Sequence, residues 1–115
     1  MADPVMAFGT RLRDHHIECG APSYRSLAKV SQRLPELYPE ALQGRTLPKL
    51  SLSGISAVLN GQRTGLPPAE WVAVFVLSCQ RRGFETCVLA TDPGPEILVD
   101  WMAWYRQAHM ALIGL

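Results

Sequence analysis

The stretch Leu52-Ser53-Gly54-Ile55-Ser56-Ala57-Val58-Leu59-Asn60-Gly61-Gln62-Arg63 decides the fold that this sequence predicts. Its apolar residues recur at i, i+3 and i+4, which places them on one face of a helix. That face carries Ile55, Val58 and Leu59. Ser53 stands in an N-cap position and Gly61 follows the last apolar residue, so we expect a helix over residues 53–60. A helix of about eight residues needs other helices to pack against.

Two helices are predicted before this stretch. The first has one apolar face, formed by Val5, Phe8, Leu12, His15 and Cys19. Gly20 follows it, where a C′ glycine belongs. Ser23 then caps a second helix from Tyr24 to about Arg33. Pro35 is expected to end that helix, because proline has no N–H for the next backbone bond.

Two more helices are predicted after it. Pro67 and Pro68 suit the first turn of a fourth helix that runs to about Arg82, and the segment is too long for a typical strand. Residues 83–94 are expected to form a loop with a weak strand tendency. The last helix spans about residues 95–113. Its apolar stripe is formed by Ile97, Leu98, Trp101, Tyr105, Ala108 and Leu112.

Residues 35–50 separate the second and third helices and are rich in proline and glycine. Leu37, Tyr38, Ala41 and Leu42 are spaced to form one short helical turn. A connection this long is unusual, and two interpretations stay open: a surface insertion, or a functional loop.

Length and composition indicate one soluble domain over residues 1–115, with its core in residues 5–82. The 115 residues suit a single domain, and 48% hydrophobic residues allow a real core. No apolar run approaches the ~18 residues of a membrane span. The N-terminus lacks the pattern of a secretory signal. Three cysteines without CxxC spacing favour a reducing cytoplasm.

The sequence contains no catalytic or phosphate-binding motif. GxGxxG, GxxxxGK[ST] and GxSxG are all absent. His15, His16 and Cys19 form the only cluster that resembles a metal site, and tetrahedral zinc would need further ligands from Cys79 or Cys87. We therefore expect no enzyme activity, no metal site and no cofactor.

The helix start Ser-Tyr-Arg-Ser-Leu-Ala at residues 23–28, followed by residues 52–63, resembles the helix-turn-helix of the XRE, or phage-repressor-like, family. In that family the first helix carries a Leu-Ala pair, and the recognition helix ends in an Asn-Gly or Ser-Gly turn followed by a basic residue. The resemblance is closest to small actinobacterial members. The matching pieces are residues 22–28, residues 53–63, Leu66-Pro67 with Trp71, and residues 74–79. It extends more weakly to Trp101, Trp104 and Arg106 in the last helix.

The resemblance implies an all-α, five-helix, lambda-repressor-like domain with an inserted loop between helices two and three. It implies a DNA-binding transcriptional regulator in the bacterial cytosol, with the recognition helix at about residues 53–60 in the major groove of duplex DNA. The residues expected on or near the base-facing side are Ser51, Ser53, Ser56, Ala57 and Asn60. Those expected at phosphates are Gln62 and Arg63, with Ser23, Tyr24 and Arg25 at the start of helix two.

The distribution of charge along the sequence adds an expectation about the partner. The net charge of +1 divides into +3 over residues 1–65 and −2 over residues 66–115, so the helix-turn-helix half is the basic one. The stretch 31–50 between the two motif helices either folds beside the helix pair or adds basic contacts through Arg33, Arg45 and Lys49.

Aromatic residues are enriched at interfaces, and a helix-turn-helix protein usually reads a two-fold site as a dimer. The last helix therefore suggests a partner interface, in a homodimer or with another protein, formed by Trp101, Trp104 and Tyr105. In the alternative, these aromatics cap the core of the same chain. The serine-rich recognition face leaves a second function open, a protein-interaction adaptor with little or no sequence-specific DNA binding.

Overall fold

A computed structural model describes residues 3–42 and 45–114, and every described element is helical. The order is α1 (Pro4–Glu18), α2 (Tyr24–Leu37), α3 (Pro39–Leu42), α4 (Leu52–Leu59), α5 (Ala69–Glu85), a 3-10 turn (Pro95–Ile97) and α6 (Leu98–Leu112). The all-α prediction is confirmed for this part of the chain, which has six α-helices where the sequence predicted five, because the short α3 lies in the predicted insertion. None of its helices is long and apolar enough to cross a membrane.

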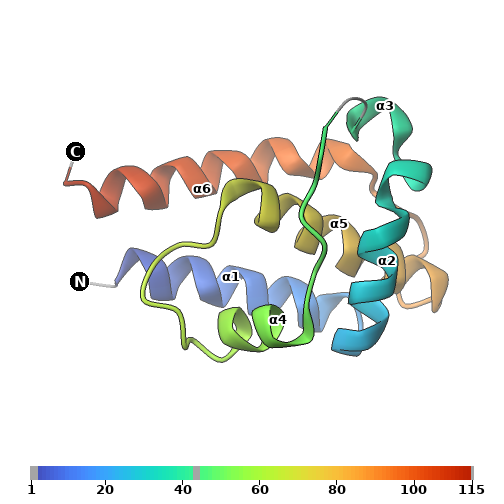
Figure 1. Cartoon of the computed structure of the whole chain (residues 1–115), viewed down its shortest axis with the longest axis horizontal. Helices are drawn as coiled ribbons and strands as arrows, with labels where there is room; N and C mark the ends of the chain where they lie inside the picture. The colour runs from blue at the N-terminus through green and yellow to red at the C-terminus, as the bar shows by residue number, and fades with distance from the viewer. Residues whose placement is uncertain (1–2, 43–44, 115) are drawn as a thin grey trace.

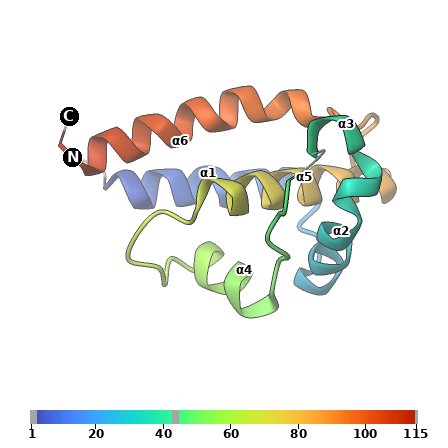
Figure 2. The same cartoon turned by 45° about the horizontal axis from the view of Figure 1, so that its top comes forward.

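Helix α5 is the centre of the domain. It packs against α1, α2 and α6, and it is buried on nearly all sides. Its fully buried side chains include Val72, Phe75, Val76 and Leu77. Helix α6 runs back along α1, while α4 rests on α1 and α2 at the opposite side of the molecule (Figures 1 and 2). One continuous core therefore supports all the long helices.

Helix α2 continues past the point where the sequence predicted its end. Pro35 lies inside the helix, which runs to Leu37. Proline removes one backbone bond, to the Ser31 carbonyl, but Leu34 and Tyr38 on either side of it are buried. The Tyr38 N–H also donates to the Leu34 carbonyl at 2.9 Å. Burial of these two side chains outweighs the missing hydrogen bond.

The segment predicted as an inserted loop is anchored to the core at both ends. It contains the four-residue helix α3, and both Leu42 and Leu50 are buried. The N–H of Leu50 donates to Ser31 Oγ at 3.2 Å, which ties the segment to α2 immediately before α4 begins. This anchoring fixes where α4 starts relative to α2.

Three other helix boundaries differ from the sequence prediction. The N-cap of α4 is Ser51, two residues before the predicted Ser53, with Oγ accepting from Gly54 N–H at 3.0 Å, and the helix runs from Leu52 to Leu59 instead of over residues 53–60. Helix α5 begins after Pro68 and continues to Glu85. The weak strand tendency at residues 86–89 is wrong: the Val88 and Leu89 N–H groups both donate to the Gly83 carbonyl in a turn.

Gly20 ends α1 as predicted, and both its backbone angle and the space around it favour glycine. Its φ of 92° is in the left-handed region, and a Cβ on it would lie 2.7 Å from Val88 Cγ2. The N–H groups of Gly20 and Ala21 donate to Ile17 and His16 carbonyls and close the helix end.

We expect Ser78→Ala to raise the free energy of unfolding by about 1 kcal/mol. Ser78 is fully buried in α5, and its hydroxyl has no hydrogen-bond partner among the described residues. Ser31→Ala is the matched control with the opposite sign, because the Ser31 hydroxyl donates to Ala28 O and accepts from Leu50 N. Urea unfolding of both variants measures the difference, and a destabilised Ser78→Ala contradicts the expectation.

Candidate nucleic-acid interface

Helix α4 presents its first turn to solvent. Its inward residues Ile55, Val58 and Leu59 are buried and hold the helix on α1 and α2. Ser51 and Ser53 are exposed at its start, and Leu52 between them is 46% exposed. The helix therefore has one buried face and one projecting end.

A glycine turn ends α4 and points the following residues outward. Gly61 has a φ of 69°, its N–H donates to Val58 O, and the Gln62 N–H donates to Ala57 O. This pair of bonds is the Schellman arrangement, which favours glycine at that position. Arg13 of α1 donates from Nη1 to the Leu59 carbonyl at 3.2 Å and fixes the helix end. Gln62 and Arg63 are both exposed beyond it.

The first turn of α2 lies on the same side of the molecule as α4, away from α6 (Figures 1 and 2). Ser23 caps it, with Oγ accepting from Ser26 N–H at 3.1 Å. Arg25 is exposed, whereas Tyr24 is half-buried with its ring 6.1 Å from that of His16. Two helix starts and one exposed cation thus share this side.

The segment around α4 carries basic residues and no acidic ones. Between Glu40 and Glu70 the sequence has three basic residues, Arg45, Lys49 and Arg63, and no Asp or Glu. None of these three forms an ion pair among the described residues. The acidic residues of α1 lie elsewhere: they line a hollow that α1 shares with the start of α6, formed by residues that include Asp14, Glu18 and Asp100.

The structure places most of the residues that the sequence predicted to contact DNA on this side of the molecule. They differ in how exposed their side chains are. The exposed ones are Ser23, Arg25, Ser51, Ser53, Asn60, Gln62 and Arg63. The half-buried ones are Tyr24, Ser56 and Ala57. Ser23 and Ser51 use their hydroxyls as helix caps. The side-chain NH2 of Asn60 donates to Ser56 Oγ at 2.9 Å, so one N–H of this amide is already engaged within the chain.

Two cations near this face were missed in the sequence. Arg13 contacts the end of α4 from α1, a relation that no local pattern signals because 46 residues separate it from Leu59. Lys29 follows Arg25 by four residues and lines an open basic hollow on α2 with Arg33 and Arg82. The i, i+4 spacing of Arg25 and Lys29 places both on one helix face, so the sequence alone could have indicated Lys29.

The aromatic residues of α6 pack on their own chain. Trp101 is 4% exposed, and its ring lies edge-on to Phe8 at 5.9 Å. Trp104 is half-buried against Trp101, with the Arg11 guanidinium 4.2 Å from its ring centre. The Tyr105 hydroxyl donates to the Pro67 carbonyl at 2.8 Å. These contacts match the alternative in which the aromatics cap the core.

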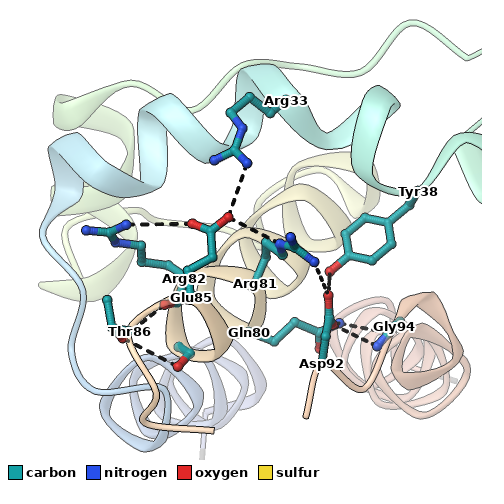
Figure 3. A network of polar contacts seen from close by, with 10 residues as sticks. Arg33, Tyr38, Gln80, Arg81, Arg82, Glu85, Thr86, Asp92 and Gly94 are labelled. Atoms are coloured by element: carbon teal, nitrogen blue, oxygen red, sulfur yellow. Dashed lines mark hydrogen bonds and ion pairs between the residues drawn. The ribbon is translucent and has the colours of Figure 1, made fainter. Parts of the chain in front are cut away.

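A polar cluster built on Asp92 fixes the end of α2 against α5 (Figure 3). Asp92 accepts from the Tyr38 hydroxyl at 2.5 Å, from Gln80 Nε2 at 3.3 Å and from its own loop at the Gly94 N–H, 2.9 Å away. Arg81 pairs with it at 3.3 Å. Burial, and then the hydrogen bond to Asp92, raise the pKa of Tyr38, so its hydroxyl remains a proton donor at neutral pH.

Glu85 forms ion pairs with three arginines. Arg33, Arg81 and Arg82 lie 3.2, 3.3 and 3.6 Å from its carboxylate (Figure 3). Burial alone would raise the pKa of Glu85, but the hydrogen bonds from Arg33 and Arg81 outweigh it and lower the pKa. Arg33 is therefore engaged within the chain.

His15 and Cys19 are both buried and lie close together. His15 Nε2 lies 3.1 Å from the Val76 carbonyl and 3.8 Å from Cys19 Sγ. Burial, and then the charge of Glu18, raise the pKa of Cys19 to about 11, which keeps the thiol protonated. No group of three or more His, Cys, Asp or Glu side chains that could hold a metal ion occurs in the described ranges.

We expect the stability of the protein to fall as the pH drops below 6.5, in part through His15. Burial lowers the pKa of folded His15 from its ordinary value of 6.5, although the bond to Val76 O opposes the shift. The unfolded chain therefore binds the proton first, and acid favours unfolding; above pH 6.5 the imidazole is neutral in both states and the effect disappears.

The measurement is the pH dependence of the unfolding free energy in wild type and His15→Gln. The variant should lose part of the slope below pH 6.5. His109→Gln, at an exposed position on α6, should retain that slope. Equal slopes in wild type and His15→Gln contradict the expectation.

Comparison with protein-family models, with curated proteins and with solved structures gives no match for this chain.

Proposed function

We propose that this protein is a DNA-binding regulator of the helix-turn-helix type, in which α2 and α4 form the motif and α4 enters the major groove. The segment 38–51, with α3, is then an insertion between the two motif helices. The observation that carries the proposal is the joint position of two helix starts on one side of the molecule (Figure 1), with no Asp or Glu in the segment around α4 between Glu40 and Glu70. Arg25, Lys49 and Arg63 form no ion pair among the described residues.

Physical chemistry supports this assignment of the face. A recognition helix meets base edges through its N-terminal residues, and in α4 these are exposed. Phosphate contacts from Arg and Lys dominate affinity, which requires cations without competing carboxylates. Ser53 and Gln62 offer polar groups at either end of the helix, while the cap of α2 directs backbone N–H groups outward. The binding expected is strongly dependent on salt.

The test measures affinity for duplex DNA at several salt concentrations, after selection of bound sequences from a random pool. The double variant Arg25→Ala, Arg63→Ala should weaken binding and reduce the slope of log K against log salt by about two. Arg106→Ala is the matched control, because this arginine is exposed on α6 and should leave binding unchanged.

Two outcomes contradict the proposal. One is the absence of duplex binding at low salt. The other is an equal loss in Arg106→Ala, which would place the nucleic acid on α6. An enriched sequence motif in the selected pool supports sequence-specific regulation, and salt-sensitive binding without a motif limits the role to a nonspecific DNA-binding protein.

The outer face of α6 favours a second candidate function, protein–protein interaction, with a second copy of this chain as the partner. Val99, Met110 and Ile113 are 74%, 49% and 57% exposed. Their spacing of eleven and three residues places them on one helix face, around Arg106. A second subunit is the occupant expected for a motif that reads two-fold sites. Sedimentation of wild type and Val99→Asp tests this candidate: a monomer at high micromolar concentration in both removes the homodimer.

A further inference from the structure

A cavity of about 260 Å³ lies between α1, the end of α4 and the connection to α5. Its inner lining is apolar, with buried contributions from Phe8, Leu12, Val58 and Pro67. Asn60 and Arg63 at its rim belong to the proposed DNA face, whereas its apolar lining is used neither by those contacts nor by the α6 face. Ligand sites are typically concave and mostly apolar with a few placed polar groups, and this cavity has that form.

Gly9 keeps the α1 wall of the cavity open. It is central to the arc of α1 that lines the space, because its neighbours at i−4, i−3, i+3 and i+4 line it too: Val5, Met6, Leu12 and Arg13. A Cβ built on Gly9 meets no atom within 4 Å. Glycine inside a helix is unfavourable relative to alanine, and no neighbouring atom requires it here. The missing side chain leaves room for something other than this chain.

Two guanidinium groups stand at the cavity without carboxylate partners. Arg13 donates only to neutral acceptors, the Leu59 carbonyl at 3.2 Å and Thr10 Oγ1 at 3.0 Å, so other N–H groups of its fork remain available. Arg63 is exposed on the opposite wall, formed by the α4–α5 connection. Neither arginine takes part in an ion pair in the part of the chain that the structure describes.

We infer that this cavity binds a small carboxylic acid whose apolar body fills the space between α1 and α4 and whose carboxylate is held by Arg13 and Arg63. An apolar cavity of about 150 Å³ holds benzene, so the volume here suits a phenyl ring with a short acidic tail. Guanidinium groups bind carboxylates through paired hydrogen bonds, which distinguishes the acid from a neutral analogue. The inference does not rest on the proposed DNA binding, although Arg63 takes part in both, because the species tested is the free protein without nucleic acid.

The experiment is a titration of the full chain with 3-phenylpropanoate, followed by amide NMR. The amides of Gly9, Gly61 and Gly65, which line the cavity, should shift saturably, while those of Gly20 and Gly83, which lie outside it, should not. The neutral amide 3-phenylpropanamide should bind at least about tenfold more weakly, because it lacks the charge that the two arginines pair with.

Two variants separate the cavity from its charges. Gly9→Leu places a side chain in the cavity at a helical position with open space, and it should abolish the shifts while the protein stays folded. Gly9→Ala is its control and should retain binding. Arg63→Gln should remove the preference for the acid over the amide. Absence of saturable shifts, equal binding of acid and amide, or undiminished binding to Gly9→Leu overturns the inference.

Discussion

Phe75→Ala is expected to lower the free energy of unfolding by about 4 kcal/mol, the largest loss from any single change considered for this protein. Phe75 is fully buried in α5. Its ring stacks on Trp71 at 5.2 Å and lies 6.3 Å from the ring of His16 in α1. Truncation removes apolar burial and leaves a cavity that α1 and α5 cannot close without giving up other contacts of α5 with α2 and α6.

The same substitution at Phe84, also in α5, is the matched control. Phe84 is 37% exposed, and the Arg81 guanidinium lies 5.3 Å from its ring centre. Its loss should be less than about 1 kcal/mol. Urea unfolding measures both. Similar losses in the two variants would contradict a core centred on Phe75.

Asp92→Ala is expected to lower the free energy of unfolding by about 3 kcal/mol. The side chain of Asp92 is 13% exposed. It accepts hydrogen bonds from Tyr38 and Gln80 and forms an ion pair with Arg81 (Figure 3). Its removal leaves the Tyr38 phenol without its acceptor and takes one of two acceptors from Gln80 and from Arg81, which keep the Gly94 carbonyl and Glu85. Because Tyr38 follows the last turn of α2, this turn and α3 should loosen first, and hydrogen exchange of their amides checks that location.

Two comparisons isolate the charge and the position of Asp92. Asp92→Asn keeps an acceptor for the Gly94 N–H but loses the pair with Arg81, so it should lie between wild type and Asp92→Ala. Asp14→Ala removes an exposed acid from α1 and should change stability by less than about 0.5 kcal/mol. A loss in Asp92→Ala no larger than that of Asp14→Ala contradicts a structural role for the cluster.

Only part of the candidate site could be predicted from the sequence. The residues of α4 and its glycine turn were readable, because cap and periodicity are local signals. Arg13 was not readable, since its bond to Leu59 O joins distant segments. The sequence placed Trp101, Trp104 and Tyr105 close together on the last helix but left open whether a partner or their own core covers them. That distinction depends on where Phe8 and Pro67 lie.

The sequence by itself determined the helical class, the order of the long helices and the glycine ends at Gly20 and Gly61, because periodicity, capping and left-handed turns depend on residues a few positions apart. Only the tertiary structure decided that α2 continues through Pro35, that α4 begins at Leu52 and that a cavity opens beside Gly9. Each of these depends on burial against a distant segment: Leu34 and Tyr38 in the core, Leu50 tied to Ser31, and α1 facing the end of α4. Free energies of packing of this kind override local preference and are not contained in it.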